Sequence, residues 1–213
     1  MKDNEIKLEY VLPADIEKRS FEIIAGELQE KKIVLPEEQR LVTMRAIHTS
    51  ADFDYAKTLC YSENAVEIAK ELIRKGADIV TDTNMALAGI SRKTLAKFGG
   101  HAHCFMADED VAREAKDRQV TRATISMERA AKLDKPVIFA IGNAPTALVS
   151  LYEIMEKTNW KPAFVIGVPV GFVNVEAAKE LIMTREVPYI VNRGRKGGSN
   201  VAAAICNAIL YQL

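Results

Sequence analysis

The sequence predicts an α/β fold: a mostly parallel sheet of about five strands, covered by helices on both faces and preceded by a helical N-terminal segment. Two observations support this prediction. From residue 77 onward, short runs of β-branched and other apolar residues alternate with helical patterns. These runs are apolar nearly throughout, rather than at every second position, which is typical of parallel strands buried on both faces.

The segment before residue 77 predicts helices. Residues 13–31 carry apolar side chains at roughly helical spacing. A second helix is expected to open at Pro36, because proline suits the first helical position. Leu41, Met44 and His48 then follow at i, i+3 and i+7. This spacing predicts that His48 projects from the apolar face of the helix, near its end.

A third helix is expected over residues 62–75, with Ser62 as its cap and Gly76 as its end. Strands and helices then alternate along the rest of the chain. Strands are expected at 77–81, 101–106, 136–141, 163–168 and 188–191. Helices are expected at about 83–97, 109–132, 144–157, 174–184 and 199–212.

The composition limits the classes of protein to consider. The 213 residues are 48% hydrophobic, which is enough to bury the core of one domain over residues 1–213. Lys+Arg and Asp+Glu number 29 each, whereas nucleic-acid binders usually have a basic excess. The three cysteines form no CxxC motif, the first residues lack the apolar region of a secretory signal, and the longest apolar run, 163–173, is too short to cross a bilayer. We expect a soluble cytoplasmic protein that binds neither nucleic acid nor membrane.

Polar and glycine-rich segments follow the expected strands. Ligands of parallel sheets bind beyond the carboxyl ends of the strands. Turn chemistry explains part of this composition, but its concentration at most of the strand ends favours a binding site. The segments are 81–85, 107–110, 142–146, 169–174 and 192–199.

The segment "NRGRKGGSN", residues 192–200, combines three cations with three glycines. It leads into a helix that Ser199 or Asn200 is expected to cap. Backbone N–H groups at a helix start, together with Arg and Lys, bind anions. Neither GxxxxGK[ST] nor GxGxxG is present, so the anion is not read as a nucleotide, and carboxylates suit the segment equally well. A flexible solvated loop is the alternative.

Three further features suit a binding site. In "IGNAPTAL", Gly142 permits close approach and Pro145 opens a helix, although an ordinary strand-to-helix turn has the same composition. Arg122 begins a helix, where a cation is unfavourable to the helix dipole. Asp82 follows an apolar strand and would either accept a hydrogen bond from a ligand or cap the next helix.

The three histidines differ in their surroundings. His48 lies in "RAIHTSADFDY", directly before hydroxyls and two carboxylates, Asp52 and Asp54. A buried core histidine and a catalytic acid or base both fit this position. His101 and His103 point to the same face of a strand, but no further ligands at metal-binding spacing accompany them, so a structural role is favoured over a metal site.

Six segments together resemble the precorrin-8X methylmutase family of corrin biosynthesis, which includes the cobalt-precorrin-8 methylmutases. They are "IEKRSFEII", "RAIHTSADFDY", "TDTNMALAGI", "GNAPTALVSLYE", "GVPVGFVNVEAAKE" and "NRGRKGGSNVAAAICNAI". The resemblance covers essentially the whole chain. It implies an isomerase that moves a methyl group from C-11 to C-12 of the macrocycle, without a methyl donor or other cofactor. It also implies a homodimer with the tetrapyrrole substrate near the subunit interface.

The resemblance assigns His48 as the acid that protonates the macrocycle, and we expect Asp52 or Asp54 to favour the protonated ring by charge proximity. Arginines and helix N-termini would then bind the carboxylates of the substrate, and apolar side chains would cover its ring. The predicted substrate-binding residues are Ser20, which matches a family site position, and Arg45, Thr49, Asp82, Met85, Arg122, Asn143, Ala144, Pro145, Gly171, Phe172, Val173, Arg193, Gly194, Arg195, Lys196, Gly197 and Gly198.

The residues after His48 bear on the substrate. Some family members that use a metal-free substrate carry a smaller Cys-Gly-type sequence there, whereas this chain has Thr-Ser-Ala-Asp-Phe-Asp, which is similar to members of the early-cobalt route. The resemblance therefore favours cobalt-precorrin-8, converted to cobyrinate, with the cobalt belonging to the substrate. Metal-free precorrin-8X, converted to hydrogenobyrinate, is the alternative. A non-catalytic tetrapyrrole carrier and an enzyme of phosphorylated metabolites are alternatives of other classes.

Overall fold

A computed structural model describes residues 8–213, which divide into two units. The first unit ends at Val34 and contains a 3-10 turn, η1 (Pro13–Asp15), and helix α1 (Ile16–Glu30). The helix predicted over 13–31 is therefore confirmed. The second unit begins at Leu35 and contains the sheet. That the whole chain forms one domain stays a prediction.

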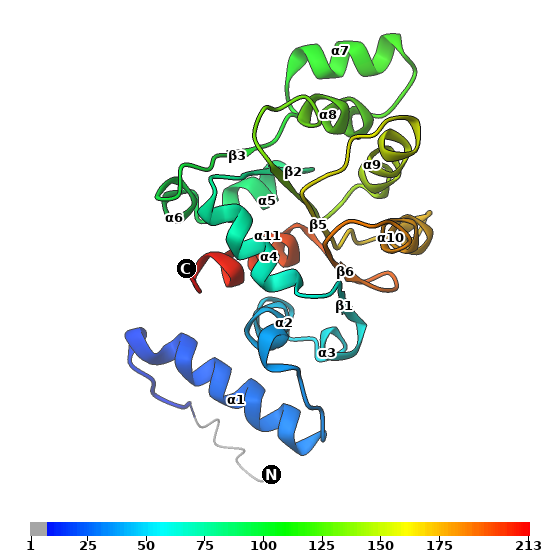
Figure 1. Cartoon of the computed structure of the whole chain (residues 1–213). Coiled ribbons are helices and arrows are strands. Elements are labelled where there is room, and N and C mark those ends of the chain that lie inside the picture. Colours follow the sequence, from blue (N-terminus) through cyan, green and yellow to red (C-terminus); the bar gives the residue numbers. More distant parts are fainter. Residues whose placement is uncertain (1–7) are drawn as a thin grey trace, which may run out of the picture. The chain divides into compact units, whose positions relative to one another are not determined.

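Within the described residues, six strands form one sheet in the order β1-β6-β5-β4-β2-β3 (Figure 1). The five predicted strands are confirmed, and neighbours among them pair in parallel. The strand β1 was not predicted; it runs antiparallel to β6 at the sheet edge and is too short and too exposed to show an apolar run. The strands are β1 (Leu59–Tyr61), β2 (Asp78–Thr81), β3 (Ala102–His103), β4 (Val137–Ile141), β5 (Phe164–Gly167) and β6 (Tyr189–Asn192).

Helices lie on both faces of the sheet, as predicted (Figure 1). On one face α8, α9 and α10 pack side by side, and on the other α11 contacts β4 and β5 and packs against α2, α4 and α5. None of the described helices is long and apolar enough to cross a membrane. The helices are α2 (Glu37–Ser50), α3 (Tyr55–Thr58), α4 (Ala65–Arg74), α5 (Asn84–Gly89), α6 (Arg92–Ala96), α7 (Glu109–Asp117), α8 (Arg122–Ala130), α9 (Pro145–Lys157), α10 (Val175–Met183) and α11 (Ser199–Leu210).

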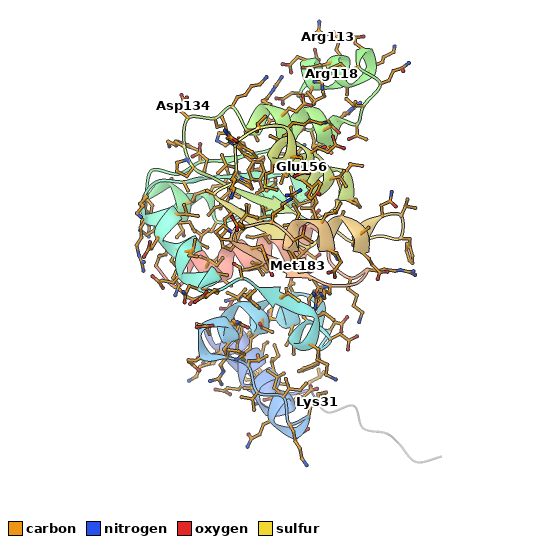
Figure 2. All side chains as sticks on the ribbon, turned by 45° about the vertical axis from the view of Figure 1, so that its right-hand side comes forward. Lys31, Arg113, Arg118, Asp134, Glu156 and Met183 are labelled. Carbon is orange, nitrogen blue, oxygen red and sulfur yellow. The ribbon has the colours of Figure 1, made fainter. Side chains whose placement is uncertain are left out.

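The core lies between the sheet and these helices, where side chains fill the space (Figure 2). Every residue of β2, β4 and β5 is buried. Phe139 of β4 packs with Leu148 and Leu151 of α9 in one cluster of buried side chains. Burial of both faces explains why these strands are apolar throughout.

Two predicted helices are each broken into a pair. The pattern over 83–97 is interrupted at Ile90, whose backbone is extended, and the Ser91 N–H donates to the Asn207 side chain (2.8 Å) instead of to its own helix. The pattern over 109–132 is interrupted at Gln119, which has a positive φ of 54°. In both places tertiary contacts and local backbone geometry override a continuous helical pattern.

Two local predictions were wrong. Ser62 does not cap α4; its hydroxyl accepts a hydrogen bond from the Tyr189 N–H (2.9 Å), because it joins β6 instead. The apolar face expected on α2 is not its buried face: Leu41 and His48 are both exposed. The helix instead buries a stripe that packs towards α11, consisting of Val42, Thr43, Met44, Ala46 and Ile47. Gly76, with a φ of 82°, does end α4 as predicted.

Candidate active site

The carboxyl edge of the parallel strands contains a topological switch point. From β2 the chain passes to β3 on one side, and β4 lies on the other side of β2. Loops that leave neighbouring strands in opposite directions open a crevice between them, and ligands of such sheets bind there. The loops that follow β2, β4, β5 and β6 carry most of the predicted substrate-binding residues.

Asp82, directly after β2, joins two of these loops. Its buried carboxylate accepts hydrogen bonds from the backbone N–H groups of Gly142, Asn143 and Ala144, at 2.9, 2.8 and 2.5 Å. Burial raises the pKa of Asp82, and the three N–H donors oppose that rise. The predicted role as a cap was wrong, because the next helix, α5, is capped by Thr83. The predicted contact with a ligand stays a prediction. Asp82 determines the shape of the loop before α9.

The hydrogen bonds of Asp82 therefore fix the N-terminus of α9 at this edge. Pro145 is its first residue, as predicted, and Ala144 precedes it. Arg122 begins α8 close by, because Thr121 donates to Thr146 of α9 (3.4 Å). The side chain of Arg122 is exposed and forms no ion pair with any residue that the structure describes. A cation and a helix N-terminus side by side suit an anionic ligand.

Large apolar side chains stand exposed at the same edge. Met85 in the first turn of α5 is 71% exposed, and Phe172 and Val173 after β5 are 83% and 79% exposed. The guanidinium of Arg195 lies over the Phe172 ring, 5.6 Å from its centre. Gly171, before this pair, donates its N–H to the Arg195 carbonyl oxygen (3.2 Å). An exposed apolar surface next to cations suits a flat apolar ring with an anionic rim.

The loop after β6, residues 193–198, closes tightly over its neighbours. The Gly198 N–H donates to the Val168 carbonyl oxygen (2.9 Å). A Cβ atom at Gly197 would lie 2.0 Å from the same oxygen, and one at Gly142 would lie 2.7 Å from the Ser199 Cα. Ser199 and Asn200 do not cap α11, contrary to the prediction; Ser199 is its first residue, and its hydroxyl bonds that of Thr83 (2.7 Å).

Gly197→Ala is expected to destabilise the protein by about 2 kcal/mol, because the added methyl group meets backbone rather than a movable side chain. Gly194→Ala is the matched control in the same loop: its φ is 74°, but no atom lies within 4 Å of an added Cβ. We expect this control to lose only about 1 kcal/mol, from backbone strain. Urea unfolding of both variants measures the difference, and equal losses would contradict the close packing of Gly197.

The cations of the 193–198 loop are compensated by acidic residues. The Nε of Arg193 bonds Glu180 (3.1 Å), and the Nε of Arg195 bonds Glu176 (2.9 Å); both acids lie on α10. Lys196 is shared by two carboxylates of the segment after α2. The loop is therefore a set of ion pairs attached to its neighbours, not the solvated basic loop that composition alone allowed.

His48 lies at the same edge, exposed in the last turn of α2. Three contacts place it there. The helix packs along α11, Asn200 Nδ2 donates to the Thr49 carbonyl oxygen (3.5 Å), and Lys196 joins the loop after β6 to the segment that follows His48. Arg45, one turn before His48, lies over the Tyr211 ring at 5.7 Å.

Asp52 and Asp54 have a partner that the sequence did not reveal. The Lys196 Nζ bonds Asp52 Oδ2 (2.6 Å) and Asp54 Oδ2 (2.5 Å). The Asp52 carboxylate also accepts the Asp54 N–H (2.9 Å). A shared ammonium offsets much of the negative charge that these carboxylates would present to His48. The expected effect of the two acids on His48 stays a prediction, and their observed contacts connect two loops of the site.

The ion pairs of Lys196 should have a defined pH dependence. The hydrogen bond from Lys196 lowers the pKa of Asp52. A lowered carboxyl pKa stabilises the fold above the pKa of the unfolded chain, and this stabilisation is lost as pH falls through the folded-state value. We expect Lys196→Gln to lower the melting temperature slightly at neutral pH and to approach the wild type as pH falls through the folded-state pKa of Asp52. Thermal unfolding of this variant, with the exposed Lys93→Gln as control, tests this, and a difference that widens in acid would contradict it.

Three further residues that the sequence analysis singled out, Ser20, His101 and His103, do not belong to these loops. Ser20 belongs to the first unit, where its hydroxyl donates to the Ile16 carbonyl oxygen (2.9 Å). His101 and His103 both approach Asp78 at the opposite end of β2, at 3.7 and 3.2 Å, which agrees with a shared face. No cluster of His, Cys, Asp or Glu among the described residues has the arrangement of a metal site.

Two residues that hold the loop after β6 were not singled out by the sequence analysis, although one of them, Asn192, lies in a predicted segment. Lys179, on α10, has a fully buried side chain whose Nζ donates to the carbonyl oxygens of Gly194 (2.7 Å) and Lys196 (2.9 Å). Asn192 donates to the same Lys196 oxygen (2.8 Å). A lysine in a helix normally points to solvent, so the only signal was the presence of apolar residues on both sides, Ala178 before it and Leu181 and Ile182 after Glu180.

Comparisons with known proteins match nearly the whole chain. A family model described as precorrin-8X methylmutase matches residues 15–212. The chain is 42% identical over 199 residues to a cobalt-precorrin-8 methylmutase of Priestia megaterium, covering 93% of this chain and 88% of that protein. It is 41% identical over 206 residues to a cobalt-precorrin-8 methylmutase of Salmonella typhimurium, covering 94% and 96%.

A solved structure shows the same fold. It is described as a precorrin-8x methyl mutase from Thermus thermophilus and matches with a TM-score of 0.82 at 35% identity, covering 92% of this chain and 96% of that chain. The family model spans nearly the whole chain, and the relatives are matched over nearly their full lengths. The chain therefore belongs to the precorrin-8X methylmutase family, whose members are isomerases of cobalamin biosynthesis.

Proposed function

We propose that the protein converts cobalt-precorrin-8 to cobyrinate by moving a methyl group from C-11 to C-12 of the macrocycle. The observation that carries the proposal is the position of His48: an exposed imidazole at the edge where exposed apolar side chains, Arg122 and the α9 N-terminus also gather. The cobalt form is favoured because the relatives at 42% and 41% identity are named for it. The metal-free substrate is the alternative, since the Thermus thermophilus structure is named for precorrin-8x.

The residues of the site divide the work between binding and proton transfer. Phe172, Val173 and Met85 cover part of the ring with apolar surface. Arg122 and the positive end of the α9 helix dipole bind carboxylates at the rim, and Arg195 binds another beside Phe172. These contacts hold the ring in one orientation, so that a single face or edge meets His48.

The reaction then requires only acid catalysis, in which the macrocycle is protonated and later deprotonated. Protonated His48 donates its proton to the macrocycle, which makes the conjugated system more electron-deficient and eases migration of the methyl group. The C-11–methyl bond breaks as the C-12–methyl bond forms within the same molecule. The proton returns to the imidazole, so the product is an isomer of the substrate. We propose that no methyl donor or cofactor takes part, and that cobalt enters and leaves as part of the substrate.

The assembly and location are part of the same proposal. The protein acts as a homodimer with the substrate near the subunit interface, which would cover apolar side chains that one chain leaves exposed. It acts in the cytoplasm. The free state of Cys60, Cys104 and Cys206 supports this, because a reducing compartment keeps thiols unpaired.

The test compares the two substrates. Purified protein is incubated with cobalt-precorrin-8 and, separately, with metal-free precorrin-8X, while the visible spectrum is followed and the product is identified by NMR of its methyl groups. Faster conversion of the cobalt form supports the proposal. Faster conversion of the metal-free form would show that precorrin-8X, and not cobalt-precorrin-8, is the substrate. Binding of both without conversion would indicate a tetrapyrrole carrier. Binding of neither, with phosphate binding instead, would favour an enzyme of phosphorylated metabolites.

A further inference from the structure

A buried ammonium lies beneath the loop formed by residues 193–198. The Lys179 side chain is 0% exposed, and its Nζ is within hydrogen-bonding distance of two backbone carbonyl oxygens, those of Gly194 and Lys196. Within residues 8–213, no carboxylate forms an ion pair with it. Glu176, the acid that acts on it through charge, is instead bonded to Arg195.

Such a group is costly to bury. A charge removed from water destabilises the fold unless hydrogen bonds compensate, and an apolar side chain of the same length would avoid this cost. Burial lowers the pKa of Lys179 to about 8, which reflects the cost directly. The compensation comes from the two carbonyl oxygens, and both belong to the loop that joins β6 to α11. We therefore expect the lysine to be retained because its two hydrogen bonds stabilise the conformation of that loop.

The contacts of Lys179 turn the loop backbone inward. The Asn192 side chain also donates to the Lys196 carbonyl oxygen (2.8 Å) and to the Arg193 carbonyl oxygen (3.2 Å). Together, Lys179 and Asn192 bind three carbonyl groups of the loop, those of Arg193, Gly194 and Lys196. Gly197 is pressed against Val168 at the far end of the loop. With the carbonyl groups held inward, the side chains of Arg193 and Arg195 extend over the outer surface, where both are more than half exposed.

We propose that Lys179 is a positioning residue for substrate binding: its ammonium, held between the Gly194 and Lys196 carbonyl oxygens, fixes the 193–198 loop in the shape that presents Arg195 and the α11 N-terminus to the carboxylates of the substrate. This rests on the proposed function, because it takes the loop to be part of the corrinoid site. Lys179 itself touches neither the substrate nor the reacting atoms. Its effect is on binding, through the loop.

The test uses Lys179→Met, which keeps the length of the apolar stem and removes the donors, in the full-length protein. Hydrogen exchange of residues 193–198 without substrate is expected to become about tenfold faster, while exchange in the strands stays unchanged. With cobalt-precorrin-8, KM is expected to rise about tenfold and kcat to stay within about twofold. Lys157→Met, an exposed lysine at the end of α9 that pairs with Glu153 of its own helix, is the control and should change neither.

A double-mutant cycle separates positioning from general destabilisation. Arg195→Ala should raise KM in the wild type and should have a smaller effect in Lys179→Met, where the loop is already displaced. Lys179→Gln, which retains an N–H₂ donor without the charge, is expected to fall between wild type and Lys179→Met, and it replaces the methionine variant if that variant does not fold. Unchanged loop exchange, or equal losses throughout the protein with kcat reduced as much as KM is raised, would overturn the proposal.

The two proposals fail in different ways. If the wild type neither binds nor converts a corrinoid, the proposed function is wrong, and the substrate role of Lys179 falls with it. If the wild type converts cobalt-precorrin-8 and Lys179→Met does so with the wild-type KM, the proposed function stands and the role of Lys179 is overturned. Hydrogen exchange of the loop needs no substrate, so it decides in either case whether Lys179 holds the loop.

Discussion

His48→Ala is expected to slow the methyl shift by a factor of about 10²–10⁴ while corrinoid binding stays within a few-fold of the wild type. The imidazole is exposed at the end of α2 and is not part of the packed core, so its loss removes a proton donor without opening a cavity. The apolar and cationic groups that we expect to bind the ring are carried by other elements, chiefly α5, α8, α9 and the loops after β5 and β6. Chemistry and binding should therefore separate.

The measurement has to isolate the chemical step. Single-turnover reactions with enzyme in excess avoid a rate limit from product release, and spectral titration gives the affinity independently. Arg40→Ala, an exposed residue on the same helix, is the control and should leave both quantities unchanged. His48→Asn keeps a polar side chain of similar shape but cannot donate an ionisable proton, so it should be as slow as His48→Ala. A single-turnover rate within about tenfold of the wild type in both variants would remove His48 from the reaction.

The alternation of strands and helices was predictable because it depends on local sequence. Strands β2, β4 and β5 are buried on both faces, so their apolar runs have no polar interruption and stand out from the helices between them. The same reasoning predicted the candidate site, since the carboxyl ends of parallel strands meet at one edge. Strand β1 was not predicted because its three residues pair at the sheet edge and are only partly buried, so their sequence shows no periodic pattern.

The contacts that shape the site were not predictable, because they join residues far apart in the chain. Asp82 bonds residues 60 and more positions later, and Lys196 bonds Asp52 and Asp54 across more than 140 positions. In the sequence Asp82 resembled a helix cap and Lys196 resembled part of a solvated basic loop. The local sequence shows which polar groups lie near the end of a strand. The partners of these groups depend on the order of the strands in the sheet, which the local sequence does not show.

His48 shows the same limit at the level of one helix. Its spacing from Leu41 and Met44 suggested an apolar face, yet Met44 is buried and the other two are exposed. The buried stripe is displaced because α2 packs along α11 through residues such as Val42 and Ala46. The displacement matters for function: a histidine packed in the core would be shielded from a large substrate, whereas the exposed ring is accessible to it.

Asp82→Asn is expected to lower the free energy of unfolding by about 2–4 kcal/mol. The Asp82 carboxylate is 1% exposed and accepts three backbone N–H groups of residues 142–144. An asparagine supplies one oxygen in place of two and turns an N–H₂ group towards backbone donors, so at least one buried N–H loses its partner. Urea unfolding of the variant measures the loss. Asp134→Asn, at an exposed position that Figure 2 shows at the surface, is the control and should change stability by less than about 0.5 kcal/mol.

The same substitution should weaken substrate binding, because the loop that Asp82 holds leads directly into α9. The positive end of this helix dipole faces an anion at the sheet edge only while Ala144 and Pro145 keep their positions. We expect affinity for cobalt-precorrin-8 to fall about tenfold at a temperature where Asp82→Asn is still folded, with the single-turnover rate at saturation nearly unchanged. A variant that is destabilised but binds like the wild type would show that Asp82 supports the fold alone. A variant that binds normally and is also as stable as the wild type would contradict the three hydrogen bonds themselves.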